Sequence, residues 1–399
     1  MNRIRALITL DEGVAPTAVE TALPAEGGIE VVEWLEGGSP ERTGQRRNGL
    51  DLVIVACSAN LKGAIPLIEN AVKLHPEQPV VVLQLDGAGS NGFMQQVFAA
   101  GADDIIALPE APERIRHAIQ KAIARRRGTA LTNGAVPAPL ICILGPKGGT
   151  GKTVTACNLA VAMAEQGSRV CLVDLDLQFG DVALGLRLPP ERTIYDLARS
   201  GGTLDAEKLE DYLTAHSSGV RALLAPIRPD HAGTVRSDFI TEVLAVLRSM
   251  GDVVIVDTPA GFPAEAITAI DSSTDACVVG MLDAFSLKDT KLGLETLDRM
   301  GYDRGSIRIV LNRADTHVGI SSDDIKAILG VEPDVLVPSQ RDIARTITEG
   351  TPIVTAQPKS TAAKAFRMLA SLYMTAPKGA SAEPAPSPEP RRKPLLRRA

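Results

Sequence analysis

The chain has 399 residues, a net charge of −6 and only 3% aromatic residues, which argues against a DNA-binding protein that depends on a basic field or on stacking with bases. Its hydrophobic content of 45% suffices for two sizeable cores, while no apolar run is long enough to span a bilayer. The opening residues MNRIRALITLDEG reach acidic side chains too early for a signal peptide, so we expect a cytoplasmic protein.

Residues 1–127 predict a first α/β domain. Apolar strands are expected at 6–10, 52–55, 80–83 and 105–107, and helix-like stretches lie between them. This alternation favours a doubly wound, flavodoxin-like parallel sheet, with an unrelated small α/β fold as the alternative. Asp11 and Glu12, just after the first strand, are expected in a solvated turn.

The stretches DLVIVA, PVVVLQL and GADDIIALPEAPERIRHAIQKAI resemble a response-regulator receiver domain from its third strand to its last helix. The receiver positions for the phosphoacceptor, the hydroxyl residue and the lysine hold Ala56, Gln84 and Leu108 here. The resemblance therefore implies a pseudo-receiver that cannot be phosphorylated and serves for docking. Residues 128–138, GTALTNGAVPA, predict a linker because they carry no periodicity.

A glycine-rich turn follows an apolar strand in ICILGPKGGTGKT, residues 141–153. Glycines allow positive φ and close backbone approach to phosphate oxygens, and a helix N-terminus adds a favourable dipole. The lysine before the last threonine can bind the β- and γ-phosphates, and that threonine can place its hydroxyl on Mg²⁺. We expect the nucleotide contacts to come from Lys147, Gly148, Gly149, Thr150, Gly151, Lys152, Thr153 and Val154.

Lys147 and the double glycine after it match the pattern K-G-G-x-G-K-[ST], so this loop resembles that of the ParA/MinD ATPases, with Pro146 where the general phosphate-loop pattern has glycine. The resemblance implies a P-loop ATPase domain over residues 139–375 that binds ATP with Mg²⁺. It also implies a homodimer with ATP at the interface, in which Lys147 reaches the partner's nucleotide. Lys147 and Lys152 are thus expected to be catalytic.

Carboxylates end two further apolar strands, VCLVDLD and DVVIVD. By resemblance to the same family, Asp176 orients the attacking water, Asp174 supports the metal shell and Asp257 holds Mg²⁺ through water. A plain surface acid remains the alternative for Asp174, and a strand-capping acid the alternative for Asp257. Asn312, at the end of IRIVLNR, resembles the residue that contacts adenine, although a turn-forming asparagine stays open. Pro338 is expected to pack near the base.

The five cysteines are scattered and are expected to be buried free thiols, and the dispersed histidines assign no metal site. Residues 376–399 are rich in proline and alanine and end in arginines and a lysine. This composition predicts a disordered tail, and weak contact with an anionic membrane is a further expectation.

The pairing of a degenerate receiver with this loop, together with the phrase DLDLQFGDVALGL, resembles the CpaE/TadZ family of Flp (Tad, type IVc) pilus assembly. That resemblance implies a slow ATPase whose ATP-dependent dimerisation localises or assembles the pilus secretion machinery. The N-terminal domain would bind the pilus or polar proteins, at a pole or at the inner face of the membrane. Two alternatives stay open: a scaffold that binds ATP without hydrolysing it, and a MinD/ParA-type positioning ATPase for another cargo.

Overall fold

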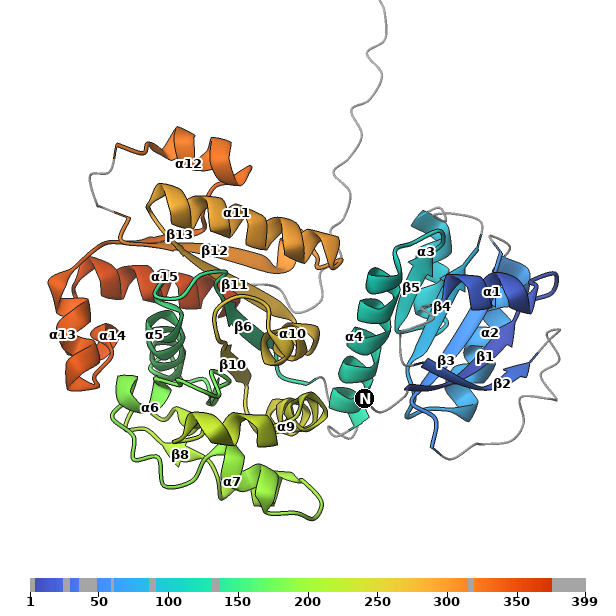
Figure 1. Cartoon of the computed structure of the whole chain (residues 1–399), viewed down its shortest axis with the longest axis horizontal. Coiled ribbons are helices and arrows are strands. Elements are labelled where there is room, and N and C mark those ends of the chain that lie inside the picture. The colour runs from blue at the N-terminus through green and yellow to red at the C-terminus, as the bar shows by residue number, and fades with distance from the viewer. Residues whose placement is uncertain are drawn as a thin grey trace, which may run out of the picture.

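The computed structural model describes residues 4–23, 29–35, 49–58, 61–85, 91–130, 137–314 and 319–374. Figure 1 shows two α/β units, with the helix α4 (Pro112–Ala130) on the side of the first unit that faces the second. The tail expected at 376–399 lies outside the described residues, as does the middle of the expected linker.

The first unit is a parallel sheet with the order β2-β1-β3-β4-β5, which confirms the flavodoxin-like prediction. Its strands are β1 (Ile4–Leu10), β2 (Ile29–Leu35), β3 (Leu52–Cys57), β4 (Val80–Gln84) and β5 (Asp104–Ala107). Its helices before α4 are α1 (Pro16–Ala22), α2 (Leu61–Leu74) and α3 (Asn91–Ala99). One core lies between the sheet and the α1 and α4 side, and a second core lies on the α2 and α3 side.

Three details of this unit differ from the expectations. The edge strand β2 was not predicted. Asp11 is only 6% exposed and accepts a hydrogen bond from the Glu12 amide, at 2.8 Å from its Oδ1, so the solvated turn is wrong for Asp11 although Glu12 is exposed. The helix α4 also continues to Ala130, three residues beyond the expected boundary at 127.

The second unit is an eight-stranded sheet with the order β13-β12-β11-β6-β10-β7-β9-β8, in which only β8 runs antiparallel to its neighbour. The prediction of a second doubly wound parallel sheet is thereby confirmed. The strands are β6 (Leu140–Leu144), β7 (Val170–Asp174), β8 (Thr214–Ala215), β9 (Arg221–Leu223), β10 (Val253–Asp257), β11 (Asp275–Met281), β12 (Ile307–Asn312) and β13 (Val335–Val337).

Helices cover both faces of this sheet. The core on one face packs against α7 (Ile194–Arg199), α8 (Ala206–Glu210), α9 (Ser237–Met250), α10 (Ala264–Asp271), α11 (Ala284–Arg299) and α12 (Ser322–Leu329). The core on the other face packs against α5 (Lys152–Ala164), α6 (Val182–Gly185), α14 (Ile353–Ala356) and α15 (Thr361–Met374), and α13 (Arg341–Glu349) lies beside α6. Two 3₁₀ turns, η1 (Pro229–Thr234) and η2 (Arg304–Ser306), complete the unit.

The carboxyl ends of β6, β7, β10 and β12 lie at one edge of the sheet because these strands are parallel. In open α/β sheets this edge is where ligands bind. All five cysteines are buried, as expected, and none of them forms a disulfide. Among the described residues, no helix combines the length and the apolar character that crossing a bilayer requires.

Candidate functional site

The glycine-rich loop joins β6 to α5 and curls back over the end of the sheet. Gly149 and Gly151 have φ values of 77° and 93°, a region that side chains with a Cβ rarely adopt. A Cβ on Gly151 would also collide with the Asn312 side chain. Asn312 Nδ2 donates a hydrogen bond to the Thr150 carbonyl at 2.6 Å. The end of β12 therefore braces the loop from behind.

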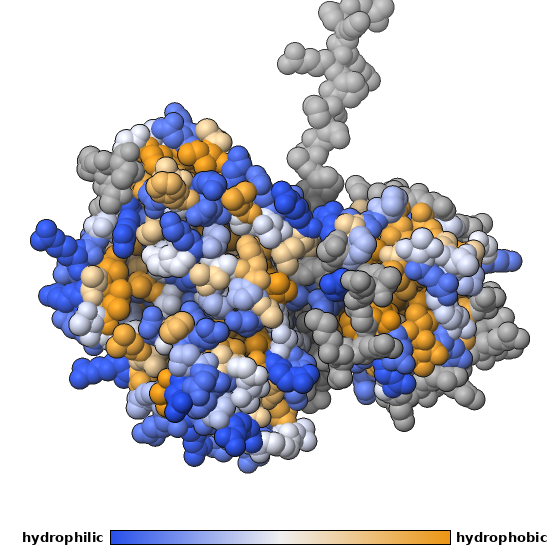
Figure 2. Space-filling view, viewed as in Figure 1, coloured by the Kyte–Doolittle hydropathy of each residue, from blue (hydrophilic) through white to orange (hydrophobic). Residues whose placement is uncertain are grey.

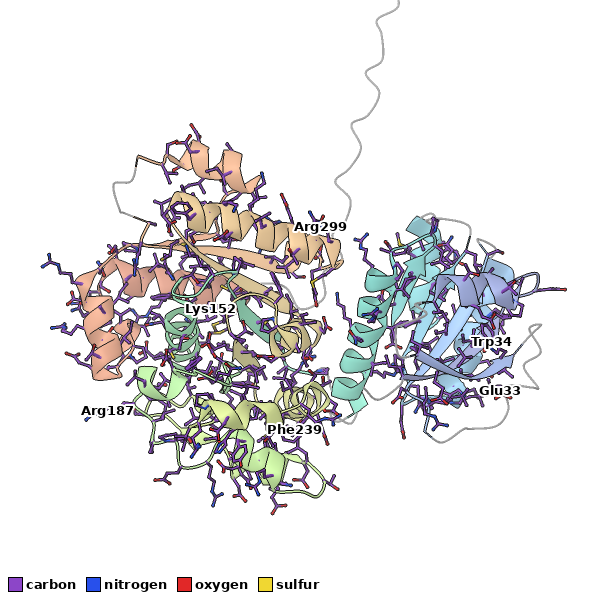
Figure 3. The ribbon with its side chains drawn as sticks, in the orientation of Figure 1. Glu33, Trp34, Lys152, Arg187, Phe239 and Arg299 are labelled. Atoms are coloured by element: carbon purple, nitrogen blue, oxygen red, sulfur yellow. The ribbon has the colours of Figure 1, made fainter. Side chains whose placement is uncertain are left out.

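A cleft of about 800 Å³ opens in front of this loop. The loop residues 148–154 form one wall, and Figure 3 places Lys152 at the start of α5 within this unit. The segment 337–341 and α13 form the opposite wall, and Asn312 and Pro338 both line the cleft. The volume is within the range of sites for nucleotide-sized ligands. The structure thus brings the expected phosphate-binding residues 148–154 and the expected base-binding residues Asn312 and Pro338 to one cavity.

Asp257 lies at the end of β10 and is completely buried. Neither of its carboxylate oxygens makes a hydrogen bond to any described residue. Burial raises the pKa of Asp257 to about 7; the nearby Thr153 hydroxyl and the Lys152 ammonium oppose this rise without meeting the geometry of a hydrogen bond or ion pair. A buried carboxylate without a partner is costly, and a hard cation beside it would remove that cost.

Lys152 is also largely buried, with 8% of its surface exposed. Burial lowers the pKa of its ammonium, while the carboxylates of Asp257 and Asp176 favour the charged form. A cation held in a partly dry cleft attracts an anion more strongly than one in open water. Lys152 is therefore well placed to bind phosphate oxygens.

The other two predicted carboxylates, Asp174 and Asp176, differ in their burial and in their hydrogen-bond partners. Asp174 is buried, and its two oxygens accept hydrogen bonds from the amides of Asp176 (3.1 Å) and Val182 (3.0 Å). This geometry holds the chain that returns from β7, and the place of Asp174 in a metal shell stays a prediction. Asp176 lines the cleft, and its Oδ1 accepts a hydrogen bond from the Phe179 amide at 3.2 Å.

The segment after Asp257 is tied to the neighbouring strand ends. The Thr258 hydroxyl donates to the Ile143 carbonyl at 2.7 Å, and the Gly261 amide donates to the Gly145 carbonyl at 3.1 Å. These bonds connect the chain that follows the buried carboxylate directly to the start of the phosphate loop. A displacement of either segment would therefore displace the other.

Lys147 is exposed and does not line the cleft, unlike residues 148–154 that follow it. Its Nζ lies 5.9 Å from the centroid of the Phe285 ring, at the start of α11. Phe285 itself is 75% exposed. The Lys147 ammonium thus lies near Phe285 and outside the lining of its own cleft.

Asn158 and Arg313 are among the cleft residues that the sequence reasoning missed. Asn158, on α5, donates to the Val154 carbonyl at 2.8 Å and accepts from the Val354 amide at 3.2 Å, which joins α5 to α14. Its signal was a lone amide in an apolar helical run. Arg313 lines the cleft with a φ of 55°, unusual for a residue other than glycine, and no sequence pattern indicated that conformation.

The residues present fit a magnesium nucleotide: a loop with exposed backbone, a buried lysine and a threonine hydroxyl line one cleft, and the orphaned carboxylate of Asp257 is buried near Lys152 and Thr153. Among the described residues, no cluster of histidine, cysteine and carboxylate side chains forms a preformed metal site. A cation at this position would therefore share its coordination with the phosphates, as Mg²⁺ commonly does.

Comparison with known proteins matches residues 141–353 to the CobQ/CobB/MinD/ParA nucleotide binding domain. An uncharacterized ATP-binding protein of Methanocaldococcus jannaschii is 30% identical over 234 residues, which are 58% of this chain and 86% of that protein. The septum site-determining protein MinD of Synechocystis is 26% identical over 238 residues, covering 58% and 87% of the two chains.

Among solved structures, MinD of Pyrococcus horikoshii complexed with Mg-ADP is 28% identical and superposes with a TM-score of 0.54, covering 60% of this chain and 96% of that one. The family match begins at the phosphate-loop strand, so the first sheet lies outside it. The match spans more than half of the chain and contains the loop, the carboxylates and the base-side wall of the cleft. The chain therefore belongs to the CobQ/CobB/MinD/ParA family of nucleotide-binding domains.

Proposed function

We propose that this chain is an ATP-dependent dimerisation switch that hydrolyses ATP slowly. The observation that carries the proposal is that two lysines of one loop have different surroundings. Lys152 is buried in the cleft, whereas Lys147 is exposed and does not line the cleft. An exposed lysine outside its own cleft is suited to the phosphates bound by a second copy.

Within one subunit, the amides of residues 148–153 and the Lys152 ammonium would bind the phosphates. The Thr153 hydroxyl and Asp257 would hold Mg²⁺, Asp257 through water, and Asp174 would support this shell by fixing the 176–182 segment. In this position Mg²⁺ would neutralise charge on the terminal phosphates. Asp176, which lines the cleft, would orient the attacking water in line with the leaving group.

The base would occupy the wall formed by Asn312 and Pro338. Because Asn312 Nδ2 is engaged with the Thr150 carbonyl, the Asn312 oxygen is the atom that remains for the adenine amino group. This assignment gives Asn312 two tasks, bracing the loop and contacting the base.

The surface near Lys147 and Asp176 supports association with a second copy. Phe285, beside Lys147, and Phe179, beside Asp176, are 75% and 71% exposed. Figure 2 shows apolar patches among hydrophilic ones on this unit. Contiguous exposed apolar patches commonly mark an interface.

For the N-terminal unit, residues 1–127, we propose a pseudo-receiver that selects the partner, and for 139–375 the ATPase. Ala56 sits in β3 between Leu10 and Leu83 of the neighbouring strands, and it has no atom that accepts a phosphoryl group. By the sequence resemblance, the partner would be the Flp/Tad pilus secretion machinery, which the switch would place at a cell pole. The 26% identity to MinD equally supports a positioning ATPase for another cargo.

The test is the molar mass of the full chain by light scattering with Mg-ATP, with Mg-ADP and without nucleotide, beside phosphate release from the same samples. We expect a dimer with Mg-ATP alone and measurable phosphate release. Lys147→Ala should bind ATP but stay monomeric, whereas Asp176→Ala should dimerise without releasing phosphate. Lys364→Ala, an exposed lysine on α15, is the matched control and should behave like the natural chain.

Different failures of this test have different meanings. A dimer without phosphate release would favour the non-hydrolysing scaffold. A mass that does not depend on nucleotide would contradict the switch altogether. A dimeric Lys147→Ala variant would contradict the assigned role of Lys147 while leaving the ATPase activity standing.

A further inference from the structure

The helix α4 has two differently engaged faces. Ile115 and Ile119, one turn apart, are completely buried in the core of the first unit. Arg114 and Lys121, seven residues apart and so on a common face of the helix, reach the second unit. Figure 1 shows α4 lying between the first sheet and the helices α9 and α10, and α4 packs along α9 and touches α10.

The contact on the second unit centres on the last residue of α10. Asp271 is 6% exposed, and the Tyr302 hydroxyl donates a hydrogen bond to its Oδ1. Lys121 Nζ of α4 lies 5.3 Å from the centroid of the Tyr302 ring, in the geometry of a cation–π contact. Nearby, the Arg114 guanidinium donates to the Asp298 carbonyl at 3.4 Å. We call Lys121, Tyr302 and Asp271 the joint cluster.

The other end of α10 begins in the nucleotide site. Only six residues separate Asp257 from the first residue of α10, and Gly261 among them has a φ of 80°. The Gly261 amide is bonded to the Gly145 carbonyl at the start of the phosphate loop. A helix of eight residues is about 12 Å long, so one rigid rod connects the buried carboxylate with the joint cluster.

The rod is firmly packed between its two ends. Ala266, Ala269 and Ile270 are completely buried against the sheet. Just past the last residue of α10, the Ser272 carbonyl accepts a hydrogen bond from Arg248 of α9, the helix along which α4 packs. A short buried helix of this kind transmits a displacement rather than absorbing it, because packed interiors deform little.

We propose that α10 couples the nucleotide site to the N-terminal unit, so that the state of the phosphate loop and the 258–261 segment sets how tightly the joint cluster holds α4. The inference rests on the proposed nucleotide function and adds its regulation: the N-terminal unit is released or held according to the bound nucleotide. By linkage the effect is reciprocal, so weakening the joint cluster must change nucleotide affinity as well.

Hydrogen exchange on the full chain, read by mass spectrometry, tests the coupling. The probes are Mg-ADP, the non-hydrolysable analogue Mg-AMPPNP, and no nucleotide. We expect peptides of the 145–158 segment to be protected by both nucleotides. Peptides of α4 should exchange at least threefold differently between the two nucleotides. In Tyr302→Phe, which keeps the ring under Lys121 but loses the hydroxyl, that difference should shrink below twofold.

Tyr212→Phe is the matched control, because Tyr212 also carries a cation over its ring, Arg192 at 5.7 Å, but lies away from α4. It should retain the full α4 response. Should Tyr302→Phe fold poorly, Lys121→Met weakens the joint cluster from its other side by removing the cation over the Tyr302 ring. In Lys121→Met, the ratio of the Kd values for Mg-ADP and Mg-AMPPNP should shift about fivefold.

The outcomes separate this inference from the function on which it rests. Protection of 145–158 with identical α4 exchange in both nucleotides would overturn the coupling and leave the nucleotide function intact. An α4 response that survives in both Tyr302→Phe and Lys121→Met, with an unchanged affinity ratio, would overturn the joint cluster as its route. An absence of protection at 145–158 would overturn the nucleotide function and the coupling with it.

Discussion

Asp257 is a residue that the apo fold holds at a cost. Its carboxylate is buried without a hydrogen-bond partner among the described residues, and burial raises its pKa to about 7. Proteins normally pair buried charges or coordinate them to a metal, since an isolated one is expensive. The most direct explanation is a cation-binding site, because a bound cation would offset the free-energy cost of burying this carboxylate.

Asp257→Asn should therefore stabilise the free protein and impair the loaded one. Without ligand at pH 8, we expect its free energy of unfolding in urea to rise by about 1–2 kcal/mol, because the buried charge is gone while an amide of similar size remains. The stabilisation that Mg²⁺ adds to nucleotide binding should disappear. Thermal melts with ATP in the presence of Mg²⁺ or of a chelator measure this second effect.

Asp252→Asn provides the contrast for that experiment. Asp252 precedes the same strand but is exposed and paired with Arg169, with Oδ1 and the guanidinium 2.7 Å apart. Its loss should lower stability by no more than about 1 kcal/mol. An Asp257→Asn protein less stable than the natural chain in the absence of ligand would argue against an unpaired buried charge.

At the residue scale, the sequence predicted which residues lie in or beside the cleft better than it predicted their hydrogen-bond partners. The loop spacing and the strand-ending acids led to Lys152, Asp176 and Asp257, all of which the structure places in or beside the cleft. Two backbone amides donate hydrogen bonds to Asp174, and the path of the chain after β7 brings them there. A local pattern carries no information on such a path.

The pairing of the phosphate loop with β12 shows the same limit at the scale of elements. The apolar run 307–313 predicted the strand and its terminal asparagine. Asn312 braces the carbonyl of Thr150, which is 162 residues away in the sequence. The close approach at Gly151 permits this bond, since any Cβ there would meet the Asn312 side chain.

Asn312→Ala should lower nucleotide affinity by about tenfold, equivalent to roughly 1.4 kcal/mol and thus to one hydrogen bond with its preorganising effect. Titration calorimetry with ADP and with inorganic pyrophosphate separates the two tasks of this residue. If bracing dominates, both ligands lose affinity equally. If the base contact dominates, only ADP weakens, and unchanged binding of both would contradict either task.

The strand β2 was not predicted, and the reason is its position at the edge of the sheet. The strands that were predicted are continuous apolar runs, as strands buried on both faces should be. Residues 29–35, IEVVEWL, interleave acids with apolar side chains, and the strand lies at the edge of the sheet with its side chains half-buried or exposed. A pattern of this kind is a weaker signal than a run of valines.

At the scale of the whole molecule, composition and the linker at 128–138 predicted two α/β units but not the contacts between them. The helix α4 was expected as the last element of the first unit only. In the structure its outer face also packs along α9, and Lys121 lies over Tyr302. No local sequence pattern marks Arg114 and Lys121 as contact residues, because their contacts join residues about 180 positions apart.

This joint makes the stability of the whole chain depend on pH through Asp271. Burial raises the pKa of Asp271 to about 7, against the opposing effects of the Tyr302 hydroxyl and the Lys121 ammonium. The folded state therefore binds this proton more tightly than the unfolded chain, whose aspartate pKa is 3.8. The resulting stability is fully present below about pH 4 and is lost as the pH rises through about 7.

We accordingly expect the melting temperature of the full chain to fall between pH 5.5 and pH 8, and to fall less in Asp271→Asn. Asp257 titrates in the same window with the same sign, so the comparison is made in an Asp257→Asn background. Asp230→Asn is the control, because Arg228 lowers the pKa of Asp230 and places its titration below this range. Profiles that coincide with and without Asp271 would mean that its carboxylate stays ionised in the folded chain. The hydrogen bond from Tyr302 and the charge of Lys121 would then outweigh its burial, and the joint would hold α4 with the same strength throughout this pH range.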